Sequence, residues 1–179
     1  MNSHKSLVIV LVLFIICSSL RAKESPALES SAFSIALHTL QNQINYTFER
    51  VDLLRRAMTH CSFSEENNKA FSILGEKVIE ASVSLSSLVN DIDITPKDLN
   101  KRISELSKVE ASCSFDGFQL GLHKVVRVSR KTNSSTPAVV CASFRAIFGA
   151  IAIDKRNSDD AGSVFWYVHA GGKGRAMAI

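Results

Sequence analysis

The chain contains few of the residues that interrupt regular structure. Its 179 residues include only three prolines and eight glycines, no segment is low in complexity, and no segment repeats at a fixed period. Disordered chains are usually rich in proline, glycine and charge, and repeat proteins show a fixed period, so neither class is expected beyond the chain ends. The length leaves room for one domain of ordinary size with a buried core.

The first 22 residues have the pattern of a secretory signal peptide. Lys5 supplies positive charge, an unbroken apolar run extends from Leu7 to Cys17, and small residues follow up to Ala22. The run is shorter than the roughly 20 residues that a membrane-spanning helix needs. We predict cleavage after Ala22, with Ser19 as an alternative site and an uncleaved signal anchor as the alternative interpretation. No integral membrane span is expected in the mature chain.

A large excess of charge of one sign is also absent. The formal net charge is +4 at pH 7, and removing residues 1–22 takes away Lys5 and Arg21, which leaves 19 basic against 17 acidic residues. Nucleic-acid binding dominated by electrostatics needs a larger and more clustered excess. Net charge therefore gives no support to such a function.

Cysteine is scarce, and its pattern leaves two alternatives open. Cys17 lies in the signal segment, so the mature chain keeps Cys61, Cys113 and Cys141. These three permit one disulfide with a free thiol in an oxidising lumen, or three reduced, buried thiols. No two cysteines have the CxxC spacing of a zinc site, so zinc is not expected.

Two asparagines begin the tripeptide pattern that accepts N-linked glycans. Asn45 begins Asn-Tyr-Thr and Asn133 begins Asn-Ser-Ser. Such patterns are acceptors only in a chain that enters the secretory pathway. Both residues are therefore candidate glycosylation sites, on the condition that the signal peptide is functional.

Helical periodicity is abundant, whereas strand patterns are weak. Apolar residues recur every three to four positions in six segments: 30–44, 49–60, 71–89, 94–109, 135–154 and 160–172. Thr95 before Pro96 and Thr136 before Pro137 are typical helix starts, because threonine caps the helix and proline lacks a donor that the first turn does not need. The connection 130–137 is rich in serine, threonine and asparagine, which suits an exposed loop.

Segment 71–89 is long enough to be a central core helix. Its apolar stripe consists of Phe71, Leu74, Val78, Ala81, Leu85 and Leu88. We predict an all-α domain at residues 30–170, preceded by the signal peptide at 1–22 and followed by a flexible C-terminal tail at 171–179.

Several blocks, in order, resemble the ribonuclease III domain. YTFERVDLLRRAMTHCSFSEENN (46–68) is similar to the family's opening, LGLHKVVRVSRK (120–131) to its middle, and SFRAIFGAIAID (143–154) to its last core helix. The resemblance covers about residues 40–170. It implies a helical endonuclease fold, hydrolysis of double-stranded RNA with Mg²⁺, and a homodimer that pairs through the signature helix, here 71–89.

The same resemblance indicates that the family's acidic centre is degenerate. The family places four carboxylates on two facing helices, since Mg²⁺ prefers hard oxygen ligands and activates water for attack on a phosphate. Those positions fall on Ser72, Glu76, Ala142 and Arg145. Three of the four carboxylates are absent, so we expect no catalytic residue and keep Glu76 as a candidate metal ligand only. An ion pair between Glu76 and Arg145 is the favoured alternative.

Other polar residues admit a functional and a structural interpretation. Glu80 is a substitute metal ligand or a surface acid, while His60 and His123 are acid–base groups or, as we favour, structural residues. A basic cluster offers candidate phosphate contacts or a solvated face. It consists of Lys124, Arg127, Arg130 and Lys131.

The favoured function is that of a non-catalytic, homodimeric binding protein in the secretory pathway or the lumen of the endoplasmic reticulum and nuclear envelope. The resemblance is greatest to short plant members with a signal segment and one degenerate domain, which are connected by name with nuclear fusion (karyogamy). The alternatives are a double-stranded RNA-binding protein or an endoribonuclease in RNA processing that uses Glu76 and Mg²⁺. Location in another organelle is the alternative to the lumen.

Overall fold

The computed structural model describes residues 26–171. The predicted signal peptide and residues 172–179 of the predicted tail lie outside the described residues. The chain divides into two compact units, Met1–Ile35 and Ala36–Ile179. Residues 26–35 of the first unit are helical.

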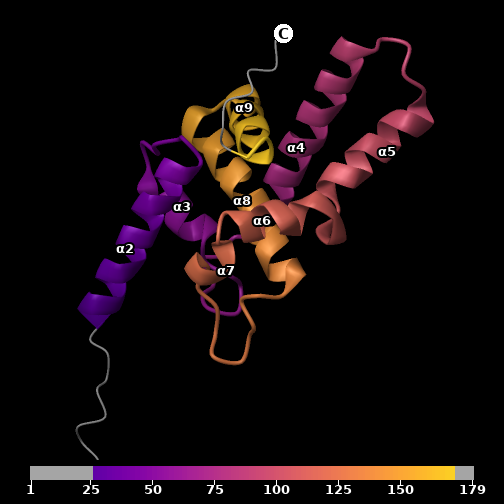
Figure 1. The fold of residues 1–179 in the computed structure, drawn as a ribbon. Helices are drawn as coiled ribbons and strands as arrows, with labels where there is room; N and C mark the ends of the chain where they lie inside the picture. Colours follow the sequence, from indigo (N-terminus) through magenta and orange to yellow (C-terminus); the bar gives the residue numbers. More distant parts are fainter. Residues whose placement is uncertain (1–25, 172–179) are drawn as a thin grey trace, which may run out of the picture. The chain divides into compact units, whose positions relative to one another are not determined.

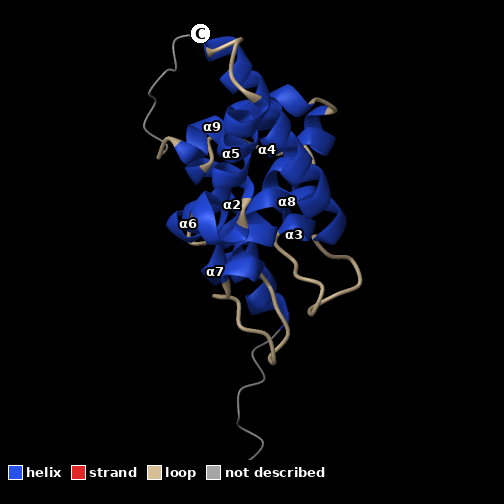
Figure 2. Cartoon of the chain, turned by 90° about the vertical axis from the view of Figure 1, so that its right-hand side faces the viewer, coloured by secondary structure: helices blue, strands red, loops and turns tan. Residues whose placement is uncertain are grey.

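Within residues 26–171 the chain forms helices and connecting loops, with no strand (Figure 2). The helices are α2 (Pro26–Gln43), α3 (Val51–Ala57), α4 (Lys69–Asn90), α5 (Pro96–Ser107), the π-helix η1 (Val109–Cys113), α6 (Ser114–Gln119), α7 (Leu122–Val125), α8 (Pro137–Lys155) and α9 (Ser158–His169). The all-α prediction is confirmed.

The two predicted threonine–proline starts open helices α5 and α8. At α5 the hydroxyl of Thr95 accepts a 3.1 Å hydrogen bond from the backbone N–H of Asp98, which satisfies one of the free donors of the first turn. At α8, Pro137 occupies the first turn, but the Thr136 hydroxyl donates to the Asn133 carbonyl instead of capping the helix.

Helix α8 is the centre of the core. Helices α3, α4, α6 and α9 pack against it, and Figure 1 shows α8 running between α4, α6 and α9. Within the described part of the chain, α8 alone is long and apolar enough to cross a membrane, and most of it is buried inside the domain, as is usual for a core helix. Helix α4, which contains the predicted core segment 71–89, packs against α8, α5 and α9.

Two glycines allow α4 and α8 to approach closely. A Cβ atom on Gly75 would overlap the backbone carbonyl of Arg145, and one on Gly149 would overlap the carbonyl of Phe71. Backbone atoms have little freedom to move away, so any side chain at either position would force the helices apart. This contact sets the distance between the helices that carry Glu76 and Arg145.

The apolar stripe predicted along α4 is only partly a core face. Phe71 and Val78 are buried, whereas Leu74 and Leu85 are 39% and 62% exposed. The outward face of the helix and of the turn after it therefore carries large apolar side chains that the second unit does not cover. They are Ile73, Leu74, Leu85, Val89 and Ile92.

One disulfide joins η1 to α8. The Cα atoms of Cys113 and Cys141 lie 5.2 Å apart, both side chains are buried, and Cys61 is a free, half-buried thiol. This is the first of the two alternatives that the sequence leaves open. Because the bond closes a loop with a sequence separation of 28, it restricts the unfolded chain and contributes about 3–4 kcal/mol to stability.

Candidate functional site

The four positions of the degenerate acidic centre lie on the two helices that cross at the glycine contact. Ser72 and Glu76 belong to α4, while Ala142 and Arg145 belong to α8. Ser72 and Ala142 are half-buried and bring no charge. Of the four positions that the family resemblance assigns to an acidic centre, two carry a charge, Glu76 and Arg145, and they face each other across the crossing.

Glu76 and Arg145 form the predicted ion pair. Nη2 of Arg145 lies 2.8 Å from Oε1 of Glu76, and the two side chains are only 16% and 29% exposed, the arginine being the less exposed. The same guanidinium group donates a hydrogen bond to the backbone carbonyl of Ser107 at the end of α5. One arginine therefore links α8, α4 and α5, and the expectation that Arg145 points toward Glu76 is confirmed.

The residues at this centre do not fit Mg²⁺. A divalent cation needs several oxygen ligands, and the single carboxylate present is already paired with a guanidinium group. Repulsion between two like unit charges 4 Å apart is about 4 kcal/mol at an effective dielectric constant near 20, and a divalent ion doubles it. Among the described residues, no group of three or more histidine, cysteine, aspartate or glutamate side chains is arranged to hold a metal.

Glu80, one turn beyond Glu76, does not join the centre. Its carboxylate lies 2.8 Å from Nζ of Lys77, three residues back along the same helix. The bond from Lys77 to Glu80, together with the charge of Glu80, raises the pKa of Lys77, which stays a cation. Glu80 is thus a paired surface acid, as the structural interpretation predicted.

The structure divides the basic cluster into two parts. Arg127 is held by the domain, because its guanidinium group donates to Oγ1 of Thr59 at 2.6 Å and lies 4.8 Å from the centre of the Phe63 ring. Its backbone also pairs with the segment at Thr59. Lys124, Arg130 and Lys131 are exposed and form no ion pair with another described residue.

His60 has a local structural role. Its Nδ1 atom accepts a 3.1 Å hydrogen bond from the backbone N–H of Ser62, and its ring is half-buried. Burial, with a smaller effect from the charge of Lys69, lowers its pKa. A neutral ring that accepts a bond within its own turn suits a helix end better than proton transfer.

A second histidine, which the sequence analysis did not single out, forms a long-range pair. Nδ1 of His169 on α9 lies 2.7 Å from Oδ2 of Asp116 on α6, and the imidazole stacks on Phe165 with ring centres 5.7 Å apart. The hydrogen bond to Asp116 outweighs burial and raises the pKa of His169. Because 53 residues separate Asp116 from His169, no local sequence pattern predicts the pair.

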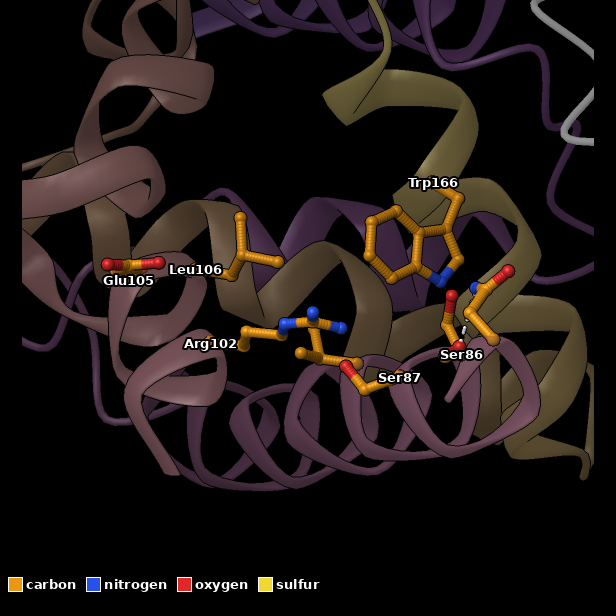
Figure 3. A pocket seen from close by; sticks show the side chains of 8 residues that line it. Ser86, Ser87, Arg102, Glu105, Leu106 and Trp166 are labelled. Carbon is orange, nitrogen blue, oxygen red and sulfur yellow. Dashed lines mark hydrogen bonds between the residues drawn. The ribbon is translucent and has the colours of Figure 1, made fainter. Parts of the chain in front are cut away.

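A hollow of about 250 Å³ lies between α4, α5 and α9 (Figure 3). Trp166 and Leu106 stand on opposite sides of it, with the guanidinium group of Arg102 between them. The indole N–H of Trp166 donates a 2.8 Å hydrogen bond to Oγ of Ser82, which fixes the ring. The hollow contains none of the four centre positions, and no sequence pattern predicts a role for the residues that line it.

A helical domain in which two crossing helices carry the positions of an acidic centre defines the ribonuclease III class of fold. The family model for ribonuclease-III-like proteins matches residues 51–165. The chain therefore belongs to the ribonuclease-III-like family.

The chain is similar to two kinds of relative. It is 55% identical over 150 residues to the protein NUCLEAR FUSION DEFECTIVE 2 of Arabidopsis thaliana, a match that covers 84% of this chain and 78% of that protein. It is 28% identical over 128 residues to ribonuclease 3 of Delftia acidovorans, covering 66% of this chain. The chain spans about half the length of this bacterial relative, 53%.

Solved structures of the nuclease domain of ribonuclease III from Campylobacter jejuni share the fold. One aligns with a TM-score of 0.69 at 22% identity and covers 76% of this chain and 95% of that domain. Another, described as showing structural flexibility in a region involved in dimer formation, aligns with a TM-score of 0.68 at 23% identity and covers 73% and 93%. At this level of identity the likeness establishes the fold alone.

Proposed function

We propose that the chain is a non-catalytic ribonuclease III-like protein that works by pairing with a second copy of itself, in nuclear fusion (karyogamy). The observation that carries the proposal is the 2.8 Å ion pair between Glu76 and Arg145. It occupies the crossing where the family resemblance puts the metal ions. A guanidinium group stabilises the remaining carboxylate as part of the fold, and the carboxylate is then no longer available to a cation.

Loss of the metal centre removes the chemistry but not the framework. Hydrolysis of a phosphodiester requires an activated water and stabilisation of negative charge, which the family resemblance assigns to Mg²⁺. Here Ser72 and Ala142 supply no charge, and Arg145 supplies a charge of the wrong sign for metal binding. Gly75 nevertheless lets α4 approach α8 closely, and the chain keeps the fold of the family.

Pairing between two copies is supported by the outward face of α4. Leu85 and Val89, four residues apart and therefore on one face of the helix, are 62% and 67% exposed, and neighbouring exposed apolar side chains commonly mark an interaction surface. In a two-fold symmetric dimer, the outward face of α4 in one copy packs against the same face of α4 in the other copy. The description of the C. jejuni domain, which mentions dimer formation, agrees with this arrangement.

A luminal location is supported by two independent features. The N-terminal 22 residues have the pattern of a signal peptide, and the Cys113–Cys141 disulfide is of a kind that persists mainly in oxidising compartments. The role in nuclear fusion is supported by the name of the 55% identical plant relative. The lumen of the endoplasmic reticulum is continuous with that of the nuclear envelope, so a luminal location is compatible with a role in nuclear fusion.

The decisive assay uses duplex RNA with Mg²⁺ or Mn²⁺, and a bacterial ribonuclease III serves as the positive control for the substrate. We expect no cleavage above background from the purified chain at any metal concentration. The Glu76→Ala variant is the matched control, because it removes the one remaining carboxylate. Cleavage by the wild-type chain that the Glu76→Ala variant lacks would overturn the proposal in favour of an endoribonuclease.

Binding of duplex RNA without cleavage is the second candidate, and the exposed cations Lys124, Arg130 and Lys131 favour it. Three phosphate contacts give a slope of about −2.7 for log K against log salt concentration. A triple substitution of these residues by glutamine is expected to remove that salt dependence. Lys97→Gln, at an exposed position on α5, is the control and is expected to leave it unchanged. Equal binding by the triple variant and the wild-type chain would exclude this candidate.

A further inference from the structure

We propose that Asn133 is the N-glycosylated residue of this chain and that its glycan covers the basic loop beside it. The inference rests on the proposed luminal location. It distinguishes between two matches to the acceptor tripeptide, Asn45-Tyr-Thr and Asn133-Ser-Ser. Both asparagines are exposed, but the structure anchors the middle residue of the first tripeptide to the rest of the domain.

Asn133 lies in the loop between α7 and α8, which Figure 1 shows extending away from the helices. Its side chain is exposed, and Oδ1 accepts a 2.9 Å hydrogen bond from the backbone N–H of Ser135. Nδ2 has no partner within the described part of the chain. The residue that must carry the hydroxyl, Ser135, is also exposed.

Most hydrogen bonds of this loop join residues within the loop. The Asn133 carbonyl accepts from Thr136, and the Thr132 N–H donates a 3.0 Å hydrogen bond to the carbonyl of Ser129. The loop is tied to the rest of the domain at its base, where the Ser129 N–H donates to the hydroxyl of Ser62. The tripeptide therefore changes conformation without disturbing the core.

Asn45 is held differently. It follows α2 with a φ of 51°, and the next residue, Tyr46, is anchored at both its backbone and its side chain. The Tyr46 N–H donates a 3.1 Å hydrogen bond to the carbonyl of Gln41, and the phenol donates one of 2.7 Å to Asp154. Presenting Asn-Tyr-Thr to an enzyme in an extended form breaks both bonds. The structure thus favours Asn133 as the acceptor.

Transfer of an oligosaccharide to Asn133 needs no oxidant or reductant. Nδ2 of Asn133 attacks C1 of an oligosaccharide carried on a polyprenyl diphosphate. A C–N bond forms, the bond from C1 to the diphosphate oxygen breaks with its electron pair on that oxygen, and the lipid diphosphate leaves with the proton that the amide loses. The product is a neutral amide that bears a bulky, hydrated chain.

A glycan at Asn133 reaches the neighbouring cations. Arg130 and Lys131 precede Asn133 by three and two residues in the same exposed loop. An oligosaccharide is larger than the loop that carries it, so it hinders approach of a polyphosphate to these two side chains. A chain that is glycosylated here loses most of the surface that favours RNA binding, and the pairing function is left.

The test translates the full chain in the presence of endoplasmic reticulum microsomes and measures protease protection and endoglycosidase sensitivity. We expect a protected product with a one-glycan shift, abolished by Asn133→Gln and by Ser135→Ala and unchanged by Asn45→Gln. The two loop variants remove the pattern in different ways, and both positions are exposed, so misfolding does not mimic the result.

The outcomes separate the two proposals. A protected chain whose shift survives Asn133→Gln, or disappears with Asn45→Gln, overturns the assignment and leaves the location intact. A protease-sensitive chain without a shift overturns the luminal location, and the assignment with it.

A second experiment tests whether the glycan covers the loop. Amine labelling followed by mass spectrometry is expected to show Lys131 protected until endoglycosidase is added, with Lys97 on α5 labelled equally throughout. Equal labelling of Lys131 with and without the glycan contradicts the covering.

Discussion

The phenol of Tyr46 donates a 2.7 Å hydrogen bond to Oδ2 of Asp154, 108 residues further along the chain. The same carboxylate accepts the backbone N–H groups of Glu49 and Arg50, each at 3.0 Å. Asp154 lies in the last turn of α8 and so fastens the connection between α2 and α3 to the core helix. Burial opposes ionisation, but the bonds from Tyr46 and the two amides outweigh it and lower the pKa of Asp154.

Replacing Asp154 by asparagine keeps the shape of the side chain and removes its charge. Hydrogen bonds to charged groups contribute about 1.5–3 kcal/mol, so we expect Asp154→Asn to lower the free energy of unfolding by about 2 kcal/mol. Urea denaturation measures the change. Asp52→Asn is the matched control, since Asp52 is 66% exposed, and its expected cost is below about 0.5 kcal/mol. Equal costs for the two variants would contradict the role of Asp154.

The same variant has a defined pH dependence. A carboxylate whose folded pKa is depressed adds stability above its unfolded pKa of about 3.9, and that stability is lost as pH falls through the folded pKa. The difference in unfolding free energy between the wild type and Asp154→Asn is therefore expected to be constant from about pH 5 to 7 and to shrink below about pH 4. A difference that stays constant down to about pH 2 would show that the charge contributes nothing.

Local signals in the sequence, together with the family resemblance, sufficed to predict the class of fold and the ion pair. Thr95 before Pro96 predicts a helix start, because the capping bond joins residues within four positions of each other. The family resemblance is spread over several ordered blocks, and the helix that carries the close contact at Gly75 is part of it. The position of Arg145 opposite Glu76 follows from that resemblance. These features depend on neighbours along the chain or on a known arrangement of helices.

Features that depend on which face of a helix packs against a neighbouring element could not be predicted from the sequence. Leu74 and Val78 both fit the three-to-four spacing of α4, yet one is exposed and the other buried, because periodicity does not say how far the packing partners extend. Arg127 looks like the other cations of its cluster, but it pairs with Thr59, 68 residues earlier. The Asp116–His169 contact is likewise made only by the packing of α6 and α9.

The Glu76–Arg145 pair is expected to show strong coupling between its members. Removing one partner leaves a largely buried charge unpaired, so Arg145→Met alone is expected to cost about 2–3 kcal/mol. Adding Glu76→Gln removes the orphaned charge and recovers part of that loss, which gives a coupling energy of about 1–2 kcal/mol. A double-mutant cycle by chemical denaturation measures it.

The pair Lys77–Glu80 provides the control for that cycle, because Lys77 is 66% exposed on the same helix. Exposed pairs on a helix are coupled only weakly, because solvent screens the two charges. Coupling of Glu76 with Arg145 no larger than the coupling measured between Lys77 and Glu80 would show that the 2.8 Å contact does not stabilise the crossing of α4 and α8.

The Asp116–His169 contact predicts stability that declines in alkaline solution. The hydrogen bond to Asp116 raises the pKa of His169, so the contribution is fully present below the unfolded pKa of about 6.5 and is lost as pH rises through the higher folded pKa. The wild type is therefore expected to exceed His169→Gln in unfolding free energy at about pH 5.5, by an amount that falls by about pH 9. A difference for His169→Gln that is equal at both pH values would exclude the charged pair.

The outward face of α4 predicts the oligomeric state. Burying apolar surface contributes about 25 cal/mol per Å², so a charge placed on that face disfavours pairing both by lost burial and by desolvation. We expect the wild-type chain to sediment as a dimer and Leu85→Glu to sediment as a monomer with an unchanged circular dichroism spectrum, because Leu85 is 62% exposed within one copy. Phe115→Glu on α6, at an equally exposed apolar residue, is the control and is expected to remain dimeric. A monomeric wild type, or a dimer that survives Leu85→Glu, would show that this face is not where two copies meet.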